Sequence, residues 1–321
     1  MLIDTHVHTA ALLPGHGQLS EAARRSVPFR ILAHRLAIDV HGDPGRVERA
    51  MESALLEVVG NAREVDAAVV LAFDGVYQKS GEPDPEATHL YVSNEYVAGL
   101  ARAHSRILFG ASVHPYRRDA IEELERCAKA GAVLCKWLPI TQVIDPADPR
   151  CFAFYEALAH FGIPLLSHTG WEHVLPRLDP SVAAPARLVP ALERGVTVIA
   201  AHSGTGRVPG KGSYLRQFME LAHRHERLYG DTAALSLPNR WSSYEPLLAD
   251  PLVRGRLVHG SDWPVPAWPR PWQHGLSRSL DLVRVRNGLD RDVLIKRDLG
   301  FDDDYWQSAA QILRVPSTHR Q

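Results

Sequence analysis

The chain has 321 residues, of which 45% are hydrophobic and 23% are charged, and its formal net charge is -1. This composition is typical of a globular protein and provides no basic field that would attract nucleic acid or an anionic membrane surface. No apolar run is long enough to cross a bilayer as a helix, and no export signal is visible, so we expect a cytoplasmic protein. Three cysteines without paired spacing indicate reduced core thiols.

Short apolar runs alternate with longer segments of helical period along the chain. The expected strands are residues 2–7, 66–73, 107–113, 132–138, 163–168, 196–202, 227–232 and 256–261. The expected helices are residues 46–62, 86–104, 117–131, 150–161, 184–194, 212–225, 242–250 and 303–314. Eight strand-and-helix units predict an α/β fold of the (β/α)8 TIM-barrel type. A doubly wound open sheet is the alternative, but the glycine-rich turn expected after its first strand is missing.

No repeat, low-complexity tract or linker divides the sequence, which favours a single domain over residues 1–321. The segment at about residues 9–45 separates the first strand from its helix, and in a barrel it would cover the mouth. Segments of this length are commonly lids or substrate-binding loops, and a solvated excursion is the alternative.

His6 and His8 stand where the first strand should end. Alternate residues of a strand point to one face, so two imidazoles at this spacing can hold one metal ion. A hydrogen-bonded structural pair is the alternative interpretation.

Four more residues of the kinds found in metal sites stand at the ends of other expected strands: Lys136, His168, His202 and Asp262. In a parallel barrel these ends open on one face, so the sequence predicts a metal site at the C-terminal ends of the strands. Imidazoles with one carboxylate suit zinc or a similar divalent ion. Such an ion lowers the pKa of a bound water to about 7, or it polarises a substrate carbonyl.

The chain resembles the amidohydrolase superfamily, in the amidohydrolase-related branch that includes aminocarboxymuconate-semialdehyde decarboxylase. The motifs that carry the resemblance are Asp4-Thr5-His6-Val7-His8, Asn94-Glu95-Tyr96-Val97, Gly110-Ala111-Ser112-Val113-His114-Pro115, Ser167-His168, Ala201-His202-Ser203-Gly204 and Gly260-Ser261-Asp262-Trp263-Pro264. The resemblance implies that His6, His8, His168 and Asp262 bind one ion. It places His202 just outside the shell, or on a second ion as in other members.

The chemical state of Lys136 distinguishes a one-metal site from a two-metal site. In two-metal relatives a carboxylated lysine on the fourth strand bridges the ions, whereas an unmodified lysine cannot bridge two cations. We favour one ion, most simply zinc, with Lys136 contacting a substrate carboxylate or carbonyl. Asp262 would then accept the proton of the attacking water while His202 steers the developing charge.

The leading hypothesis is a metal-dependent hydrolase that cleaves an amide, lactone or ester with metal-activated water. A non-oxidative decarboxylase of a small aromatic or enol carboxylate is the second hypothesis, and a barrel with a structural or sensing metal is the third. The partner would be a small molecule that can carry a carboxylate, and a homo-oligomer is compatible with the sequence. Candidate substrate contacts besides Lys136 are Arg117, Arg207, His114 and Trp263.

Overall fold

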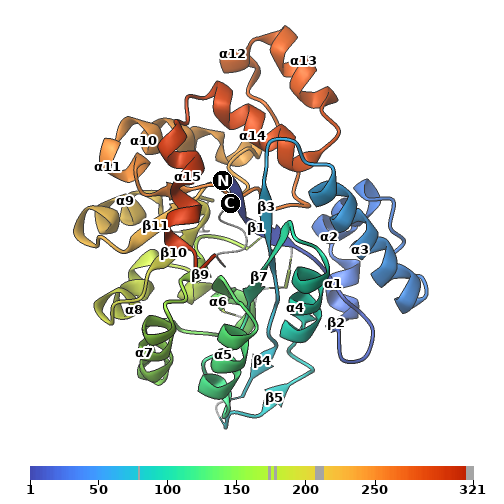
Figure 1. Cartoon of the computed structure of the whole chain (residues 1–321), viewed down its shortest axis with the longest axis vertical. Coiled ribbons are helices and arrows are strands. Elements are labelled where there is room, and N and C mark those ends of the chain that lie inside the picture. The colour runs from blue at the N-terminus through green and yellow to red at the C-terminus, as the bar shows by residue number, and fades with distance from the viewer. Residues whose placement is uncertain (79, 173–174, 177–178, 207–212, 316–321) are drawn as a thin grey trace.

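The computed structural model of the chain describes residues 1–78, 80–172, 175–176, 179–206 and 213–315. Eight parallel strands form one sheet that curls into a barrel, with helices packed around it (Figure 1). The strands of the barrel, which follow one another around it in chain order, are β1 (Ile3–His8), β3 (Ala67–Leu71), β7 (Ile107–Ala111), β8 (Leu134–Trp137), β9 (Leu165–His168), β10 (Val198–Ala201), β11 (Leu228–Asp231) and β12 (Leu257–Val258). The predicted TIM barrel is confirmed.

Main-chain hydrogen bonds close the barrel between β1 and the segment that follows β12. The amide of Thr5 donates to the carbonyl of His259 (3.0 Å), and the amide of Asp262 donates to the carbonyl of His6 (2.9 Å). Further along, the amide of His8 donates to the carbonyl of Trp263 (2.8 Å). These bonds hold the two ends of the sheet, 254 residues apart in sequence, side by side.

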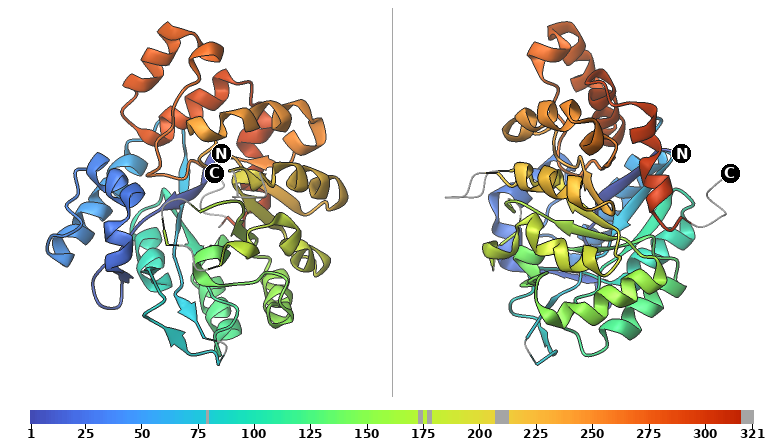
Figure 2. Two further views of the ribbon diagram at one scale, coloured as in Figure 1. Left: turned by 180° about the vertical axis from the view of Figure 1, so that it is seen from behind. Right: turned by 90° about the vertical axis from the view of Figure 1, so that its left-hand side faces the viewer.

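Helices cover the outside of the sheet, as the two further views show (Figure 2). They include α3 (Pro44–Gly60), α4 (Asn94–Ala103), α5 (Ala120–Lys129), α7 (Phe152–Phe161), α8 (Val189–Glu193), α9 (Leu215–Arg224), α10 (Tyr244–Ala249), α11 (Pro251–Arg254), α14 (Gly288–Asp298) and α15 (Asp303–Ile312). Because both faces of the strands are covered, strands such as β3 are buried along their whole length.

Further elements lie in the connections. They are β2 (Gly17–Leu19), α1 (Glu21–Arg25), α2 (Val27–Arg35), β4 (Val76–Tyr77), β5 (Pro83–Asp84), β6 (Leu90–Val92), α6 (Pro139–Gln142), α12 (Pro271–His274), α13 (Leu276–Arg284), and the 3-10 helices η1 (Pro149–Cys151), η2 (Pro180–Val182), η3 (Pro185–Leu188), η4 (His202–Gly204) and η5 (Pro238–Ser243).

Apolar side chains fill the interior of the barrel at the end where the strands begin. This buried cluster joins residues from successive strands, including Ile3, Val69, Leu108 and Leu166, and α15 covers it with Ala309. The interior is therefore a packed core at this end, whereas polar residues such as His8, His168 and Asp231 end their strands at the opposite end.

Two helix predictions need correction. Residues 86–104 do not form one helix, because Leu90–Val92 pairs with β2 in an antiparallel ribbon and the Ser93 hydroxyl caps a helix that begins at Asn94. The sequence analysis also predicted no helix between the last strand and residue 303, although α12, α13 and α14 lie in this segment. In α13 the apolar residues Leu276 and Leu280 face solvent, which obscures the helical period.

Cys127, Cys135 and Cys151 are buried free thiols, as expected for core cysteines. Within the described residues, no helix has both the length and the apolar character needed to span a membrane.

Candidate metal centre

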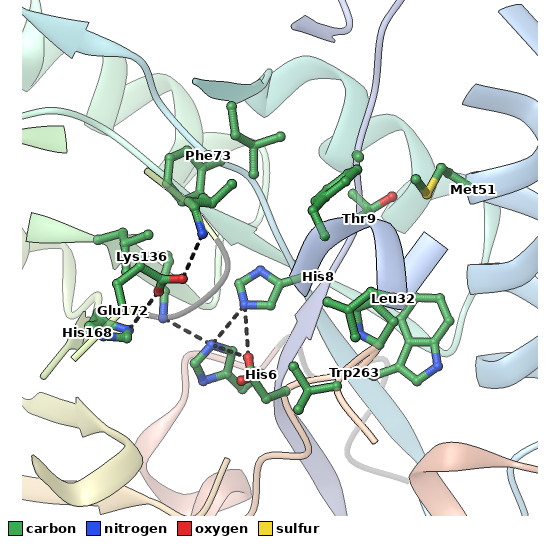
Figure 3. Close-up of a pocket in the computed structure, with 18 of the residues that line it drawn as sticks. His6, His8, Thr9, Leu32, Met51, Phe73, Lys136, His168, Glu172 and Trp263 are labelled. Atoms are coloured by element: carbon green, nitrogen blue, oxygen red, sulfur yellow. Dashed lines mark hydrogen bonds and ion pairs between the residues drawn. The ribbon is translucent and has the colours of Figure 1, made fainter. Parts of the chain in front are cut away.

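His6 and His8 bring their Nε2 atoms to within 3.1 Å of each other at the C-terminal end of β1. His6 is fully buried, whereas His8 is partly open to a cavity above the barrel (Figure 3). Two imidazole lone pairs at this distance repel unless a proton or a cation lies between them. The pair can therefore share a proton or a metal cation.

Asp262 provides the carboxylate of this cluster. Its Oδ1 atom lies 3.1 Å from Nε2 of His8 and 3.4 Å from Nε2 of His6. Burial alone would raise the pKa of Asp262, but the two imidazoles outweigh it and hold this pKa below its ordinary value. Asp262 therefore stays ionised at neutral pH.

The spacing of these donors fits a small divalent ion. Ligand atoms about 2.0 to 2.2 Å from a tetrahedral zinc ion lie roughly 3.3 to 3.6 Å from one another. The two separations that involve Asp262, 3.1 and 3.4 Å, come close to that range. The chemistry of the donor set, neutral nitrogen and anionic oxygen, suits zinc and its neighbours in the first row.

Asp231, at the end of β11, fixes the orientation of His6. Its Oδ2 atom lies 2.7 Å from Nδ1 of His6, and its Oδ1 atom accepts from the amides of His202 (2.6 Å) and Ala233 (3.1 Å). Because the carboxylate draws the ring proton to Nδ1, the lone pair of Nε2 faces the cluster. The sequence analysis missed Asp231, although it ends an expected strand as Asp262 does.

His202 lies beside His6, with ring centroids 5.3 Å apart. One potential ligand atom from each of His6, His202 and Asp262 falls within 4.8 Å of the other two. The Nδ1 atom of His202 lies 2.9 Å from the carbonyl of Ala233, so Nδ1 carries the proton and Nε2 is an acceptor. Burial, with the charge of Arg240, keeps the pKa of His202 well below its ordinary value.

The backbone is strained at two of these residues. His202 and Asp262 adopt left-handed conformations, with φ of 61° and 66°. Residues other than glycine rarely adopt this region, and in proteins it is concentrated at functional sites. His202 directly follows β10, and Asp262 comes four residues after the end of β12.

His168 ends β9 and lies next to His202, with ring centroids 4.8 Å apart. Its Nδ1 atom is 3.8 Å from Oε2 of Glu172, a buried carboxylate that also lines the cavity. The sequence analysis did not single out Glu172. This residue lies in a loop four positions after the strand, and no local pattern predicts that the loop returns toward the cavity.

Lys136, on β8, directs its amine into the same cluster. Its Nζ atom lies 3.1 Å from Nε2 of His6, and the side chain is buried. Burial lowers the pKa of Lys136 to about 8, which brings its titration close to neutral pH. An amine in this state can donate a hydrogen bond to an oxygen of a bound molecule.

Arg240, in η5, is a second buried cation near the cluster. Its Nη1 atom is 3.5 Å from the hydroxyl of Thr205, three residues after His202, and no carboxylate among the described residues forms an ion pair with it. Burial lowers the pKa of Arg240, while the charges of Asp262 and Glu172 act to raise it. The sequence analysis missed this residue too.

The cluster forms the floor of a cavity that opens above the barrel. The lining residues are His6, His8, Thr9, Ala10, Phe29, Leu32, Ala33, Leu36, Met51, Phe73, Leu90, Lys136, Leu138, His168, Glu172, Leu175, His202, Asp262, Trp263, Pro264 and Val265. The segment after the first strand thus contributes to the wall through α2.

Two of the four additional substrate candidates lie away from the cavity. Arg117 forms a bidentate ion pair with Asp119 and a further pair with Asp74. His114 is buried with both ring nitrogens bonded to main chain, at Gln142 and Tyr116. Trp263 lines the cavity, and Arg207 lies outside the described residues.

Comparisons with known proteins agree with this architecture. The fold is similar to the solved structure of a probable 2-pyrone-4,6-dicarboxylic acid hydrolase from Acinetobacter baumannii, with 16% identity, a TM-score of 0.55, and coverage of 99% of this chain and 97% of that one. The fold is also similar to that of 5-carboxyvanillate decarboxylase from Sphingomonas paucimobilis, with 13% identity, a TM-score of 0.50, and coverage of 98% of this chain and 99% of that one. A third similar structure is that of a zinc-bound amidohydrolase from Burkholderia multivorans, with 13% identity, a TM-score of 0.53, and coverage of 100% of this chain and 94% of that one.

At these identities the likeness concerns the fold. No curated protein sequence matches the chain. The family profile described as amidohydrolase, however, matches residues 3–294, which is most of the chain. The protein therefore belongs to the amidohydrolase family of metal-dependent enzymes.

Proposed function

We propose that this protein is a hydrolase that cleaves an amide, lactone or ester at a single divalent ion, most simply zinc. The observation that carries the proposal is the position of the Asp262 carboxylate, which faces Nε2 of both His6 and His8 at the floor of an open cavity. His6, His8, His168 and Asp262 would hold the ion. When bound, it would supply Lewis acidity toward a substrate carbonyl and make a water molecule more acidic.

Asp262 and His202 would do the proton chemistry. Asp262 is ionised at neutral pH, so its carboxylate can accept a proton from the attacking water. His202 is neutral and presents Nε2 as an acceptor, so it can hold that proton or orient the water before the leaving group departs. The amine of Lys136 can donate to the carbonyl oxygen or to an adjacent carboxylate of the substrate.

Decarboxylation is the competing reaction, because the same residues can hold a carboxylated substrate. The test is to incubate the zinc-loaded protein in ¹⁸O-labelled water with lactones, esters and amides, and in parallel with aromatic and enol carboxylates. We expect one ¹⁸O atom in the new carboxyl group of the acid that each hydrolysis produces, no label in the released alcohol or amine, and no release of carbon dioxide. Release of carbon dioxide without uptake of label would replace hydrolysis with decarboxylation.

The number of ions decides the role of Lys136. Metal analysis of the purified protein should give about one ion per chain, with the lysine amine unmodified in the intact mass. Two ions per chain together with a mass increase of one carbon dioxide would favour a carboxylated Lys136 that bridges two metals.

A further inference from the structure

The cavity above the metal centre has a polar side and an apolar side. Lys136, His168 and Glu172 lie to one side of the histidine pair, with the ring of Phe73 above them, whereas Leu32, Met51 and Trp263 lie to the other (Figure 3). Thr9 is the one polar side chain labelled on the apolar side. A molecule that reacts at the floor would therefore meet two different surroundings.

Helix α2 supplies much of the apolar side. Phe29, Leu32 and Leu36 line the cavity at a spacing that places them on one face of this helix and its end. The outer face of the same helix carries Val27 and Ile31, whose exposed fractions are 66% and 55%. One apolar face of the helix therefore points toward the cavity, and the opposite face is exposed to solvent.

The apolar side is open to contact and is not filled by the protein. Phe29, Leu32 and Leu36 are half-buried, as is Val265, which also lines the cavity, so apolar surface remains in contact with the cavity. Met51, on α3, is buried beneath them. Among the side chains labelled on this side, a polar substituent could find a partner only at the Thr9 hydroxyl and would otherwise lose hydration uncompensated, whereas an apolar one would leave water and cover this surface.

We infer that the substrate carries an apolar substituent, an aryl or branched alkyl group, on the side of its reacting carbonyl that faces α2, and that Leu32 is a residue that determines this specificity. The inference rests on the proposed function for the position of the carbonyl, but the apolar surface exists whether or not that function is correct. Each methylene group that leaves water should tighten binding about fourfold.

The first experiment does not require metal. The metal-free protein is titrated with the neutral fluorescent probe N-phenyl-1-naphthylamine, using wild type, Leu32→Asn and Ile31→Asn. Ile31→Asn is the matched control, because it makes the same change on the outer face of the same helix. We expect one saturable site per chain, at least about fivefold weaker binding in Leu32→Asn, and unchanged binding in Ile31→Asn. Absence of a saturable site, or equal loss in both variants, would overturn the inference.

The second experiment uses the zinc-loaded protein and two ligands that share one metal-binding group, acetohydroxamate and benzohydroxamate. Calorimetry should give at least about tenfold tighter binding of the aryl compound, and Leu32→Asn should reduce this ratio while Ile31→Asn preserves it. Equal affinities of the two hydroxamates would overturn the inference but would not contradict the proposed metal centre. If neither hydroxamate binds and the protein takes up no zinc, the proposed function fails, and the metal-free titration still decides the inference.

Discussion

Nδ1 of His6 lies 2.7 Å from Oδ2 of Asp231, while Oδ1 of the same carboxylate accepts from the amides of His202 and Ala233. In Asp231→Asn the two amides would retain the side-chain oxygen, so the new NH2 group would face His6. The imidazole proton would then move to Nε2 and block that ligand atom. We expect zinc affinity to fall about 10- to 100-fold with the fold retained, measured by competition with a chromogenic chelator.

Asp281→Asn is the control for this substitution, because Asp281 is exposed and pairs only with Arg284 among the described residues. Its zinc affinity should equal that of wild type. If Asp231→Asn binds zinc as tightly as wild type does, the carboxylate does not set the tautomer of His6.

Asp262→Asn should abolish turnover at saturating metal, because an amide cannot accept the proton of water. We expect a decrease in kcat of about 10²- to 10⁴-fold, together with weaker metal binding. Circular dichroism and ion content at high zinc provide the controls for folding and occupancy. A variant that is loaded with metal and retains wild-type kcat would contradict the role of Asp262.

The sequence predicted the residues of the cluster because strand ends converge in a parallel barrel. His6, His8, Lys136, His202 and Asp262 each end or follow an apolar run, and the topology alone brings such positions to one face. A local pattern combined with a fold class therefore sufficed for these side chains.

The surroundings of the cluster depend on contacts that no local pattern encodes. Asp231 is 225 residues from His6, and its role depends on which ring nitrogen it meets. Arg240 and Glu172 lie in connections that fold back toward the barrel. Arg117 lies away from the cavity and pairs with Asp119, which stands two residues away and forms a bidentate ion pair with it.

His114 should make the protein sensitive to mild acid. Its ring donates to the carbonyl of Gln142 and accepts from the amide of Tyr116, so a second ring proton would oppose an amide donor. Burial lowers the pKa of His114 from 6.5 to about 4. Between these pH values the unfolded chain binds a proton that the folded chain does not, so stability present above pH 6.5 is lost as the pH falls toward 4, by about 3 kcal/mol.

His114→Gln tests this contribution, because a glutamine does not titrate in that range. Urea unfolding of the metal-free protein at pH 6.5 and pH 4.5 should show a smaller loss of stability in the variant than in wild type. The comparison isolates His114 from the other buried histidines, which both proteins share. Equal losses would mean that His114 is protonated without cost in the folded protein.

A buried ion pair on α14 supports the turn that carries Asp262. The amine of Lys296 donates to a carboxylate oxygen of Asp292 and to the carbonyl of Gly260, which lies 2.8 Å away. Lys296→Met would leave the Asp292 carboxylate buried without its cation, with a hydroxyl donor from Ser236 at 2.5 Å. We expect the single variant to lose about 3 to 5 kcal/mol of unfolding free energy.

The double variant Lys296→Met with Asp292→Asn distinguishes an unpaired charge from lost packing. The asparagine can still accept from Ser236, and no charge remains to be buried, so the double variant should be more stable than Lys296→Met alone in urea unfolding. Its zinc affinity should nevertheless stay below that of wild type, because the carbonyl of Gly260 has lost its donor and the turn before Asp262 is held less firmly. A double variant less stable than the single one would show that the lysine stem contributes mainly by packing.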